Sequence, residues 1–411
     1  MQPGMVIVGA GEAGARAAFA LRENGWAGSI TLVGDEVHAP YERPPLSKAA
    51  LLDETGPSPR YIVAEERFEA EAITHLAKRS VVAIEPERRL VRFDDGNALA
   101  YEKLLLATGA APRRLPLAGA NRPGCVTLRR FEDALHLRER FRPGAEIAII
   151  GGGFIGLELA ASARQRGAAV TIIEALPRLL SRGVPAAIAE VVQERHCAAG
   201  CTLLCGEGIT AIEEEPDGLA VRLTSGKLVL ADLVVLSVGA SPSTALAEAA
   251  GLVIDNGVAV DSRLCTSDQA IFAAGDCCSF PLPVYGGRRV RLESWRNAQE
   301  QGAHAARAML GEEAAFDAVP WFWSDQYDLS LQVAGLVDEG RHTIRRDGAE
   351  GSFILCHLDD NGRLVAASGI GPGNAIARDI RLCEMLIAKR AHPDKDRLGD
   401  PNTRLKSLLA A

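Results

Sequence analysis

The sequence predicts an α/β fold in which one strand, helix, strand unit occurs twice and a segment of mixed strands and helices follows. Residues 5–36 and 146–174 each read as an apolar strand, a glycine-rich turn, a helix, a second strand and an acidic residue. From residue 319 onward the aromatic-rich stretch VPWFWSDQ begins a segment of different character. A chain of 411 residues exceeds what one core usually supports, so two or three domains are expected.

The glycines of both units follow the G-x-G-x-x-G spacing directly after a β-branched run. They are Gly9, Gly11 and Gly14 in the first unit and Gly151, Gly153 and Gly156 in the second. The first glycine allows a tight turn, the second lets backbone approach a pyrophosphate, and the third lets the helix pack on the strand. An acidic residue follows at the expected distance, Asp35 in the first unit and Glu174 in the second. The sequence therefore predicts two Rossmann-like domains that each bind one dinucleotide.

Composition and charge narrow the class of protein. The hydrophobic content of 47% and charged content of 24% are those of an ordinary globular protein. The net charge is −8 and no long run of one sign occurs, so the sequence lacks the basic character of a general nucleic-acid binder. Apolar stretches are broken by glycine and charge, so neither a signal peptide nor a membrane span is expected. Nine cysteines, an odd number, favour reduced thiols and a cytoplasmic location.

The order of the motifs resembles that of a known flavoprotein family. The first glycine fingerprint, ATG at 107–109, the second fingerprint and FAAGD at 272–276 follow one another as in flavoproteins similar to glutathione reductase. Within that group, RPPLSK, GGGFIGLE, ESWRNAQEQG and PWFWSDQ look like the NADH:ferredoxin reductases of the putidaredoxin reductase and biphenyl dioxygenase reductase type. These enzymes serve aromatic-ring dioxygenases and bacterial cytochromes P450. The resemblance covers nearly the whole chain and weakens near its C-terminal end.

The resemblance implies three domains and two cofactors. Residues 1–111 and 240–318 are expected to form a discontinuous FAD-binding domain, 112–239 an NADH-binding domain, and 319–411 a C-terminal α+β domain. FAD is expected to bind tightly but not covalently, with NADH as a co-substrate. The implied FAD residues are Gly9, Gly11, Ala13, Gly14, Asp35, Lys48, Val81, Thr108, Gly109, Arg129, Asp276, Trp295 and Trp323.

Two carboxylates of that set have a clear chemical reason. The resemblance places Asp35 on the adenosine ribose and Asp276 on the ribityl chain, where a carboxylate accepts charge-assisted hydrogen bonds from sugar hydroxyls. The alternative for Asp276 is a residue that only forms the turn after its strand. Trp295 and Trp323 match aromatic positions near the flavin, where a flat ring excludes water.

Lys48 and Glu158 are the expected catalytic residues. In the family the lysine lies beside the isoalloxazine and faces the glutamate of the second fingerprint. A cation there favours the anionic reduced ring, and Glu158 meets the nicotinamide when hydride transfer begins. The alternative is an ordinary ion pair between a surface lysine and a helix glutamate.

The second fingerprint is expected to bind NADH because the first is assigned to FAD. The implied residues are Gly151, Gly153, Phe154, Ile155, Gly156, Glu158, Glu174, Arg182 and Gly239. Glu174 favours NADH, since a carboxylate binds the ribose 2′-hydroxyl and repels a 2′-phosphate. Arg178 and Arg182 complicate this preference because an arginine can accept that phosphate. They can also be two arginines on a solvated helix start.

The cysteines argue against thiol and metal chemistry. Disulfide reductases of this fold need a redox cysteine pair close to the flavin, but the first cysteine here is Cys125, and PYERPPLSK occupies the matching stretch. Cys197, Cys201 and Cys205 lack the C-x-x-C spacing of a metal cluster. We therefore expect no metal site and no thiol relay.

The expected electron acceptor is a small ferredoxin with a 2Fe-2S cluster, of the kind that serves a Rieske-type oxygenase or a P450. The terminal oxygenase is then an indirect partner, and the protein is a monomer or a homodimer. Five arginines lie between residues 288 and 307, where they form either a patch that steers an acidic ferredoxin or a solvated helix face. Two alternatives stay open: a rubredoxin reductase-like enzyme, and an interaction flavoprotein similar to apoptosis-inducing factor.

Overall fold

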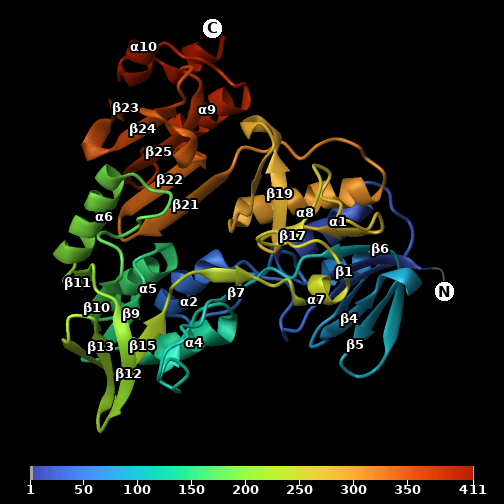
Figure 1. Ribbon diagram of the computed structural model, residues 1–411, viewed down its shortest axis with the longest axis horizontal. Helices are drawn as coiled ribbons and strands as arrows, with labels where there is room; N and C mark the ends of the chain where they lie inside the picture. The colour runs from blue at the N-terminus through green and yellow to red at the C-terminus, as the bar shows by residue number, and fades with distance from the viewer. Residues whose placement is uncertain (1–2, 411) are drawn as a thin grey trace. The chain divides into compact units, whose positions relative to one another are not determined.

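The computed structural model describes residues 3–410 and divides the chain into two compact units (Figure 1). Unit 1 comprises residues 1–43, 59–111 and 241–318, and unit 2 comprises 44–58, 112–240 and 319–411. Segment 44–58, which contains Lys48, therefore lies in unit 2. The division into three domains is finer than this one, and its boundaries stay a prediction. Within residues 3–410, no helix is both long and apolar enough to cross a bilayer.

Unit 1 is built on a sheet that begins with the first predicted strand. The strand GMVIV is buried along its whole length, as expected of a parallel strand covered on both faces. Strands β3, β2, β1, β6 and β18 are parallel neighbours, and β5 and β4 continue the sheet antiparallel beyond β6. The strands are β1 (Gly4–Val8), β2 (Ile30–Val33), β3 (Ile73–Leu76), β4 (Val81–Glu85), β5 (Leu90–Phe93), β6 (Ala98–Leu106) and β18 (Ile271–Ala273). The FAAGD motif thus begins in β18, which joins the sheet of the first fingerprint.

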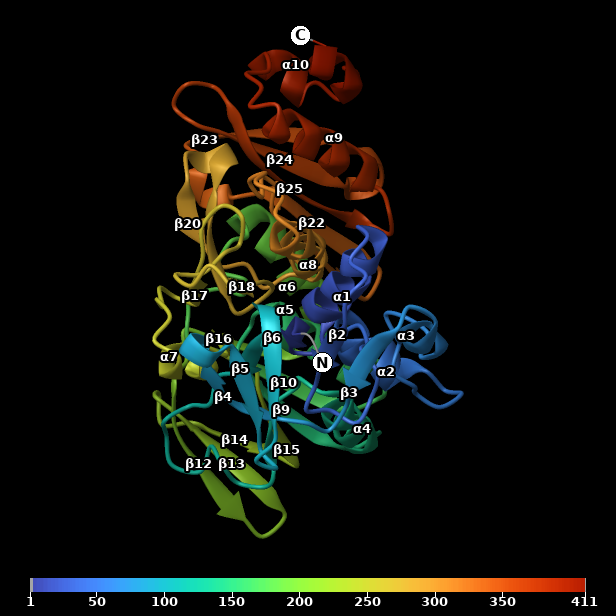
Figure 2. The ribbon, with the colours of Figure 1, turned by 90° about the vertical axis from the view of Figure 1, so that its right-hand side faces the viewer.

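Helices α1 (Glu12–Glu23) and α8 (Trp295–Met309) pack side by side in unit 1 (Figure 2). Their approach is close because α8 carries Gly302, where a Cβ would lie 2.3 Å from the carbonyl oxygen of Ala13. Unit 1 also contains α3 (Glu66–Ala70), α7 (Ala245–Ala249) and a small sheet of β17 (Val258–Ala259), β19 (Cys278–Leu282) and β20 (Arg288–Val290). Strands β7 (Ala110–Pro112) and β16 (Ala240–Pro242) pair where the chain leaves and re-enters the unit.

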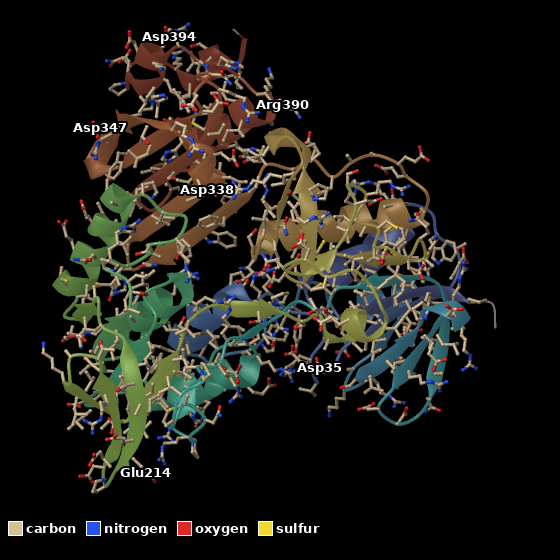
Figure 3. All side chains as sticks on the ribbon, in the orientation of Figure 1. Asp35, Glu214, Asp338, Asp347, Arg390 and Asp394 are labelled. Carbon is tan, nitrogen blue, oxygen red and sulfur yellow. The ribbon has the colours of Figure 1, made fainter. Side chains whose placement is uncertain are left out.

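Unit 2 repeats the strand, turn, helix, strand pattern around the second fingerprint. Its parallel sheet has the order β11-β10-β9-β15-β8, and β12, β13 and β14 form a separate antiparallel sheet. The strands are β8 (Cys125–Val126), β9 (Glu146–Ile150), β10 (Ala169–Glu174), β11 (Thr202–Cys205), β12 (Ile209–Glu215), β13 (Gly218–Leu223), β14 (Leu228–Ala231) and β15 (Leu233–Leu236). The helices are α2 (Ala49–Leu52), α4 (Phe131–Arg140), α5 (Phe154–Gln165) and α6 (Ala186–Ala198). Glu214 lies near the tip of the β12–β13 hairpin (Figure 3).

The C-terminal part of unit 2 is an antiparallel sheet of order β21-β22-β25-β24-β23. Its elements are β21 (Trp321–Gln326), β22 (Leu329–Gly335), β23 (His342–Asp347), β24 (Phe353–Leu358), β25 (Leu364–Pro372), α9 (Ala377–Ala388) and α10 (Lys395–Gly399). The buried Arg346 donates hydrogen bonds to the carbonyls of Leu398, Asp400, Pro401 and Thr403, which holds the last segment against the sheet. The α/β fold with a C-terminal α+β part is confirmed.

Candidate functional site

The first glycine motif leaves an open, anion-binding turn in unit 1. Gly9 has φ +113°, and a Cβ on it would lie 2.1 Å from the carbonyl oxygen of Ala107. A Cβ on Gly14 would lie 1.9 Å from the carbonyl oxygen of Gly9. Gly11 has no atom within 4 Å of its Cβ position, and no side chain caps the helix that it begins. The first-turn amides are therefore open to a pyrophosphate, as FAD requires.

The second glycine motif has the same geometry in unit 2. Gly151 has φ +108°, with a Cβ position 2.2 Å from the carbonyl oxygen of Ser237. The Cβ position of Gly156 lies 2.2 Å from the carbonyl oxygen of Gly151, whereas that of Gly153 meets no atom within 4 Å. Gly153 also begins its helix without a side-chain cap. This turn fits a second pyrophosphate.

Several predicted FAD residues gather at one edge of the unit 1 sheet. Strands β1, β2, β6 and β18 are parallel, so the residues that follow them meet at their shared carboxyl edge. The predicted residues there are Gly9, Gly11, Asp35, Thr108, Gly109 and Asp276, and Ala13 and Gly14 follow in α1. Asp35 is exposed just beyond β2 (Figure 3). The hydroxyl of Thr108 donates to the carbonyl of Ser243 at 2.7 Å, which fixes the turn after β6.

The other predicted FAD residues are placed differently. Val81 begins β4, the edge strand at the far end of the same sheet, and Trp295 is the first residue of α8. Lys48, Arg129 and Trp323 belong to unit 2. The ring of Trp323 stacks on that of Trp321 at 5.3 Å, and its Nε1 donates to Asp325. The FAD contacts of these residues stay a prediction.

Lys48 and Glu158 form the expected pair. Lys48 Nζ lies 2.8 Å from Glu158 Oε1, and the carboxylate is 7% exposed. The Ser47 hydroxyl donates to Glu158 Oε2 at 2.5 Å, and the Ser162 hydroxyl donates to the carbonyl of Ser47 at 2.6 Å. Helix α5 thus carries both Glu158 and a side chain that holds the segment bearing Lys48. Glu158 is buried and hydrogen-bonded and Lys48 is half-buried, which distinguishes the pair from an ordinary fully exposed ion pair.

Sequence reasoning missed a third donor to this carboxylate. The Ser324 hydroxyl, on β21, donates to Glu158 Oε1 at 2.6 Å. Ser324 is almost completely buried, and so is Gln326 on the same face of the strand. The sequence signal that could have revealed this donor is the pair of polar residues, Ser324 and Gln326, at alternate positions of a strand that begins with aromatic residues.

Glu174 is held at the end of β10 beside the second glycine turn. Its Oε2 accepts from the backbone N–H of Gly152 at 2.7 Å, and its Oε1 accepts from that of Leu176 at 2.8 Å. Two backbone donors fix the carboxylate where a ribose following the pyrophosphate is expected. Gly239, predicted on the same side, follows β15 with φ +102°. Phe154 and Ile155 form the first turn of α5, where Ile155 is 50% exposed.

The two arginines near Glu174 differ in their contacts. Arg178 donates to the carbonyls of Leu179, Leu180 and Val184, so its guanidinium stabilises the local loop. Arg182 is exposed to solvent. Within residues 3–410, no backbone carbonyl of this loop is shown to hold Arg182 as Arg178 is held, and the NADH contact of Arg182 stays a prediction.

Glu12, a motif position that sequence analysis left unassigned, carries an unusual carboxyl group. It is the first residue of α1, and its Oε2 is buried without a hydrogen-bond partner. Burial, with a smaller contribution from the nearby charge of Glu42, raises the pKa of Glu12 to about 7. The neighbouring side chains of Trp295 and Gln299 offset part of that rise.

The arginines between 288 and 307 are largely neutralised by carboxylates. The pairs are Arg289 with Asp255 at 3.7 Å, Arg291 with Glu293 at 2.5 Å, Arg296 with Glu300 at 2.8 Å and Arg307 with Glu312 at 3.0 Å. This pairing favours the solvated face over a steering patch. Across residues 3–410, no cluster of three or more His, Cys, Asp or Glu is arranged to hold a metal ion.

Comparisons with known proteins show which family the chain resembles along its whole length. The family model described as pyridine nucleotide-disulphide oxidoreductase matches residues 3–302, and a reductase C-terminal model matches residues 321–409. The chain is 42% identical over 407 residues to the ferredoxin–NAD(+) reductase component of the anthranilate 1,2-dioxygenase system of Burkholderia cepacia, covering 98% of both chains. It is 40% identical over 336 residues to the rubredoxin–NAD(+) reductase of Pseudomonas putida, covering 82% of this chain and 87% of the relative. The structure of the covalent putidaredoxin reductase–putidaredoxin complex matches with a TM-score of 0.92 and 35% identity over 100% of this chain and 98% of that one.

Proposed function

The chain belongs to the pyridine nucleotide-disulphide oxidoreductase family, and from this premise we propose that it is an FAD-containing NADH:ferredoxin reductase. The observation that carries the proposal is the pair of glycine turns, each with an open second glycine and an uncapped helix start. One chain with two such turns is suited to hold one dinucleotide as a cofactor and a second as a reductant. The relative from Burkholderia cepacia is by name a ferredoxin–NAD(+) reductase component.

The first turn is assigned to FAD and the second to NADH. In the first, the carboxyl-edge residues Asp35 and Asp276 accept hydrogen bonds from the sugar and ribityl hydroxyls. In the second, Glu174 is already oriented by two backbone donors and presents its carboxylate to a ribose 2′-hydroxyl. The same charge disfavours the 2′-phosphate of NADPH, so NADH is the preferred reductant.

FAD supplies the conversion between a two-electron donor and a one-electron acceptor. The protein binds and orients the reactants and controls charge. Glu158, buried and held by three donors, keeps the ammonium of Lys48 in a defined position. Lys48 is assigned to stabilise negative charge on the reduced cofactor, and Glu158 to orient the nicotinamide. A catalytic acid or base is not needed for a direct hydride transfer.

The acceptor is a 2Fe-2S ferredoxin, and the terminal oxygenase of a Rieske or P450 system is reached only through it. The dioxygenase-system relative and the putidaredoxin complex support this choice. Rubredoxin is the second candidate acceptor because a rubredoxin reductase shares 40% identity with the chain. All nine cysteines are free thiols, which supports a location in the reducing cytoplasm.

The test is anaerobic reduction of the purified yellow protein followed by electron transfer to candidate carriers. We expect NADH to bleach the flavin absorbance faster than NADPH does. Cytochrome c reduction is then expected to depend on added 2Fe-2S ferredoxin more than on rubredoxin. A colourless protein after reconstitution, or a flavin that NADH leaves oxidised, would reject the proposal. A stronger response to rubredoxin would move the enzyme to the second acceptor.

A further inference from the structure

The carboxylate of Glu158 is held from three directions within unit 2. Its Oε1 receives Lys48 Nζ at 2.8 Å and the Ser324 hydroxyl at 2.6 Å, and its Oε2 receives the Ser47 hydroxyl at 2.5 Å. Ionised carboxylates only accept hydrogen bonds, so both hydroxyls donate to it. A buried carboxylate requires such partners because its desolvation is costly. Ser324 is the one donor that comes from the C-terminal sheet.

The orientation of the Ser324 hydroxyl is set by a second residue on the same strand. Gln326 Nε2 lies 3.3 Å from Ser324 Oγ, and Gln326 Oε1 lies 2.9 Å from Nε2 of His196. An amide nitrogen can only donate, so the oxygen of Ser324 is the acceptor of that bond and its proton is directed to Glu158. The amide oxygen of Gln326 can only accept, which requires a proton on His196 Nε2.

His196 is the last residue of this series of hydrogen bonds, and its imidazole is neutral. It lies on α6 with no exposed surface, and burial lowers its pKa below the usual value. Its Nδ1 lies 3.8 Å from the Cys201 thiol, and its ring packs edge-on against Tyr327 at 5.1 Å. With a proton on Nε2, His196 donates to Gln326, Gln326 donates to Ser324, and Ser324 donates to Glu158.

Strand β21 is what brings these groups together. Alternate residues of a strand share a face, so Ser324 and Gln326 are buried while Asp325 between them is exposed. They contact Glu158 on α5 and His196 on α6, two helices of the second dinucleotide unit. Apolar residues at these positions would avoid the cost of burying polar groups. The presence of the polar residues Ser324 and Gln326 at these positions therefore indicates a role other than packing.

We propose that Ser324 is a positioning residue that fixes the Glu158 carboxylate, and with it Lys48, and that Gln326 and His196 fix the direction of the Ser324 hydroxyl. This inference rests on the proposed function, because Glu158 and Lys48 are assigned there to hydride transfer. Ser324 itself touches neither substrate nor cofactor in this role. It acts by holding one rotamer of Glu158 so that the carboxylate and the ammonium stay in place when NADH binds.

The first test compares Ser324→Ala with the matched control Ser330→Ala in the flavin-loaded protein. Ser330 lies on the neighbouring strand β22, is 7% exposed and pairs with Asp325, so its removal perturbs the same sheet without touching Glu158. Stopped-flow reduction by NADH is measured together with NAD(+) affinity by calorimetry. We expect Ser324→Ala to slow flavin reduction about tenfold with less than about a threefold change in affinity, because one charge-assisted hydrogen bond is lost while the glycine turn and Glu174 are intact.

The outcomes distinguish a failure of the role assigned to Ser324 from a failure of the proposed reductase function. Ser324→Thr keeps a hydroxyl at the same position and is expected to recover most of the rate. Equal rates for the Ser324→Ala and Ser330→Ala variants, or a Ser324→Thr variant no faster than Ser324→Ala, would overturn the role of Ser324. An unmodified protein whose flavin NADH fails to reduce would instead overturn the proposed function.

A second measurement takes its main readout, the tautomer of His196, from the unmodified protein. In protein with ¹⁵N-labelled histidine, long-range ¹H–¹⁵N spectra report which ring nitrogen carries the proton. We expect His196 to be the neutral Nε2–H tautomer, and Gln326→Leu to shift its resonances while Ser330→Ala does not. An Nδ1–H tautomer would reverse the Gln326 amide and point the Ser324 proton away from Glu158, which contradicts the proposal.

Discussion

The two glycine motifs have the same backbone but present different side chains. In both, the first and third glycines lie against backbone carbonyls and the second faces open space. The residue after the second glycine differs: Glu12 in the first motif and Phe154 in the second. Backbone geometry is therefore set by the glycines, whereas the variable positions adapt each turn to its surroundings and to its nucleotide.

The two variable residues show how far this adaptation goes. Phe154 packs edge-on against Phe322 of β21 at 5.1 Å, so it ties the start of α5 to the C-terminal sheet. Glu12 places a largely buried carboxyl at the helix start that is assigned to FAD, with its pKa raised to about 7. The acidic residues that follow the motifs differ as well, since Asp35 is exposed and Glu174 is held by two backbone N–H groups.

The largest expected effect tests whether the glycines really have distinct roles. Gly151→Ala places a Cβ 2.2 Å from a carbonyl oxygen at φ +108°, so we expect a loss of more than about 3 kcal/mol in stability. Gly153→Ala is the control, because φ is −84° and its Cβ position is open. We expect it to leave the thermal midpoint unchanged while weakening NAD(+) binding. Equal midpoints for the two variants would contradict the division of roles.

The same pair in the first motif extends the comparison. Gly9→Ala is expected to destabilise unit 1 for the same reason, with a Cβ 2.1 Å from the Ala107 oxygen. Gly11→Ala is expected to purify with less FAD, because its Cβ enters the space assigned to the pyrophosphate. Flavin content per chain and the thermal midpoint are the measurements. A Gly11→Ala protein with full flavin content would show that the first turn does not hold the cofactor.

The next effect concerns the acidic residues after the motifs. Glu174→Ala is expected to reduce the preference for NADH over NADPH by roughly thirtyfold, about 2 kcal/mol, because it removes a ribose acceptor and a repulsive charge. The ratio of kcat/KM for the two reductants measures this. Asp35→Ala is the matched control in the other motif: it should weaken FAD retention and leave the ratio unchanged. If the ratio changed in Asp35→Ala and not in Glu174→Ala, NADH would have to be assigned to the first motif and FAD to the second.

A smaller effect distinguishes Glu12 from Phe154 through pH. The folded pKa of Glu12, about 7, lies above the ordinary 4.5, so the folded state binds more protons between these values. Stability therefore falls as the pH rises from about 4.5 through 7. We expect Glu12→Gln to remove this penalty and to gain about 1 kcal/mol relative to the unmodified protein at pH 8, with less gain at pH 5. Denaturant titrations at the two pH values measure it, and a gain that does not grow with pH would contradict the raised pKa.

Sequence reasoning succeeded where the signal is local. The glycine turns, the strand at FAAGD and the acidic residues just after β2 and at the end of β10 depend on short spacings, and each lies at the strand end that the pattern predicted. The Glu158 contacts with Ser47 and Ser324 join residues 111 and 166 positions apart, so no periodicity reveals them. Glu12 was missed for another reason: it occupies a variable position of a recognised motif, and only burial makes its carboxyl unusual. The segment 65–78 looks continuous and amphipathic, yet it divides into α3 and β3 because Ile73–Leu76 pairs with β2.

An effect of similar size tests whether Phe154 anchors the start of its helix by packing against a neighbouring strand. An edge-on aromatic pair contributes about 0.5–1.5 kcal/mol beyond the area that it buries. Phe154→Leu and Phe322→Leu, singly and together, form a double-mutant cycle in which we expect a coupling energy of about 1 kcal/mol. The thermal or denaturant midpoints of the four proteins measure it. A coupling near zero would mean that the start of α5 is positioned by its glycines alone, and the second motif would then lose its main structural difference from the first.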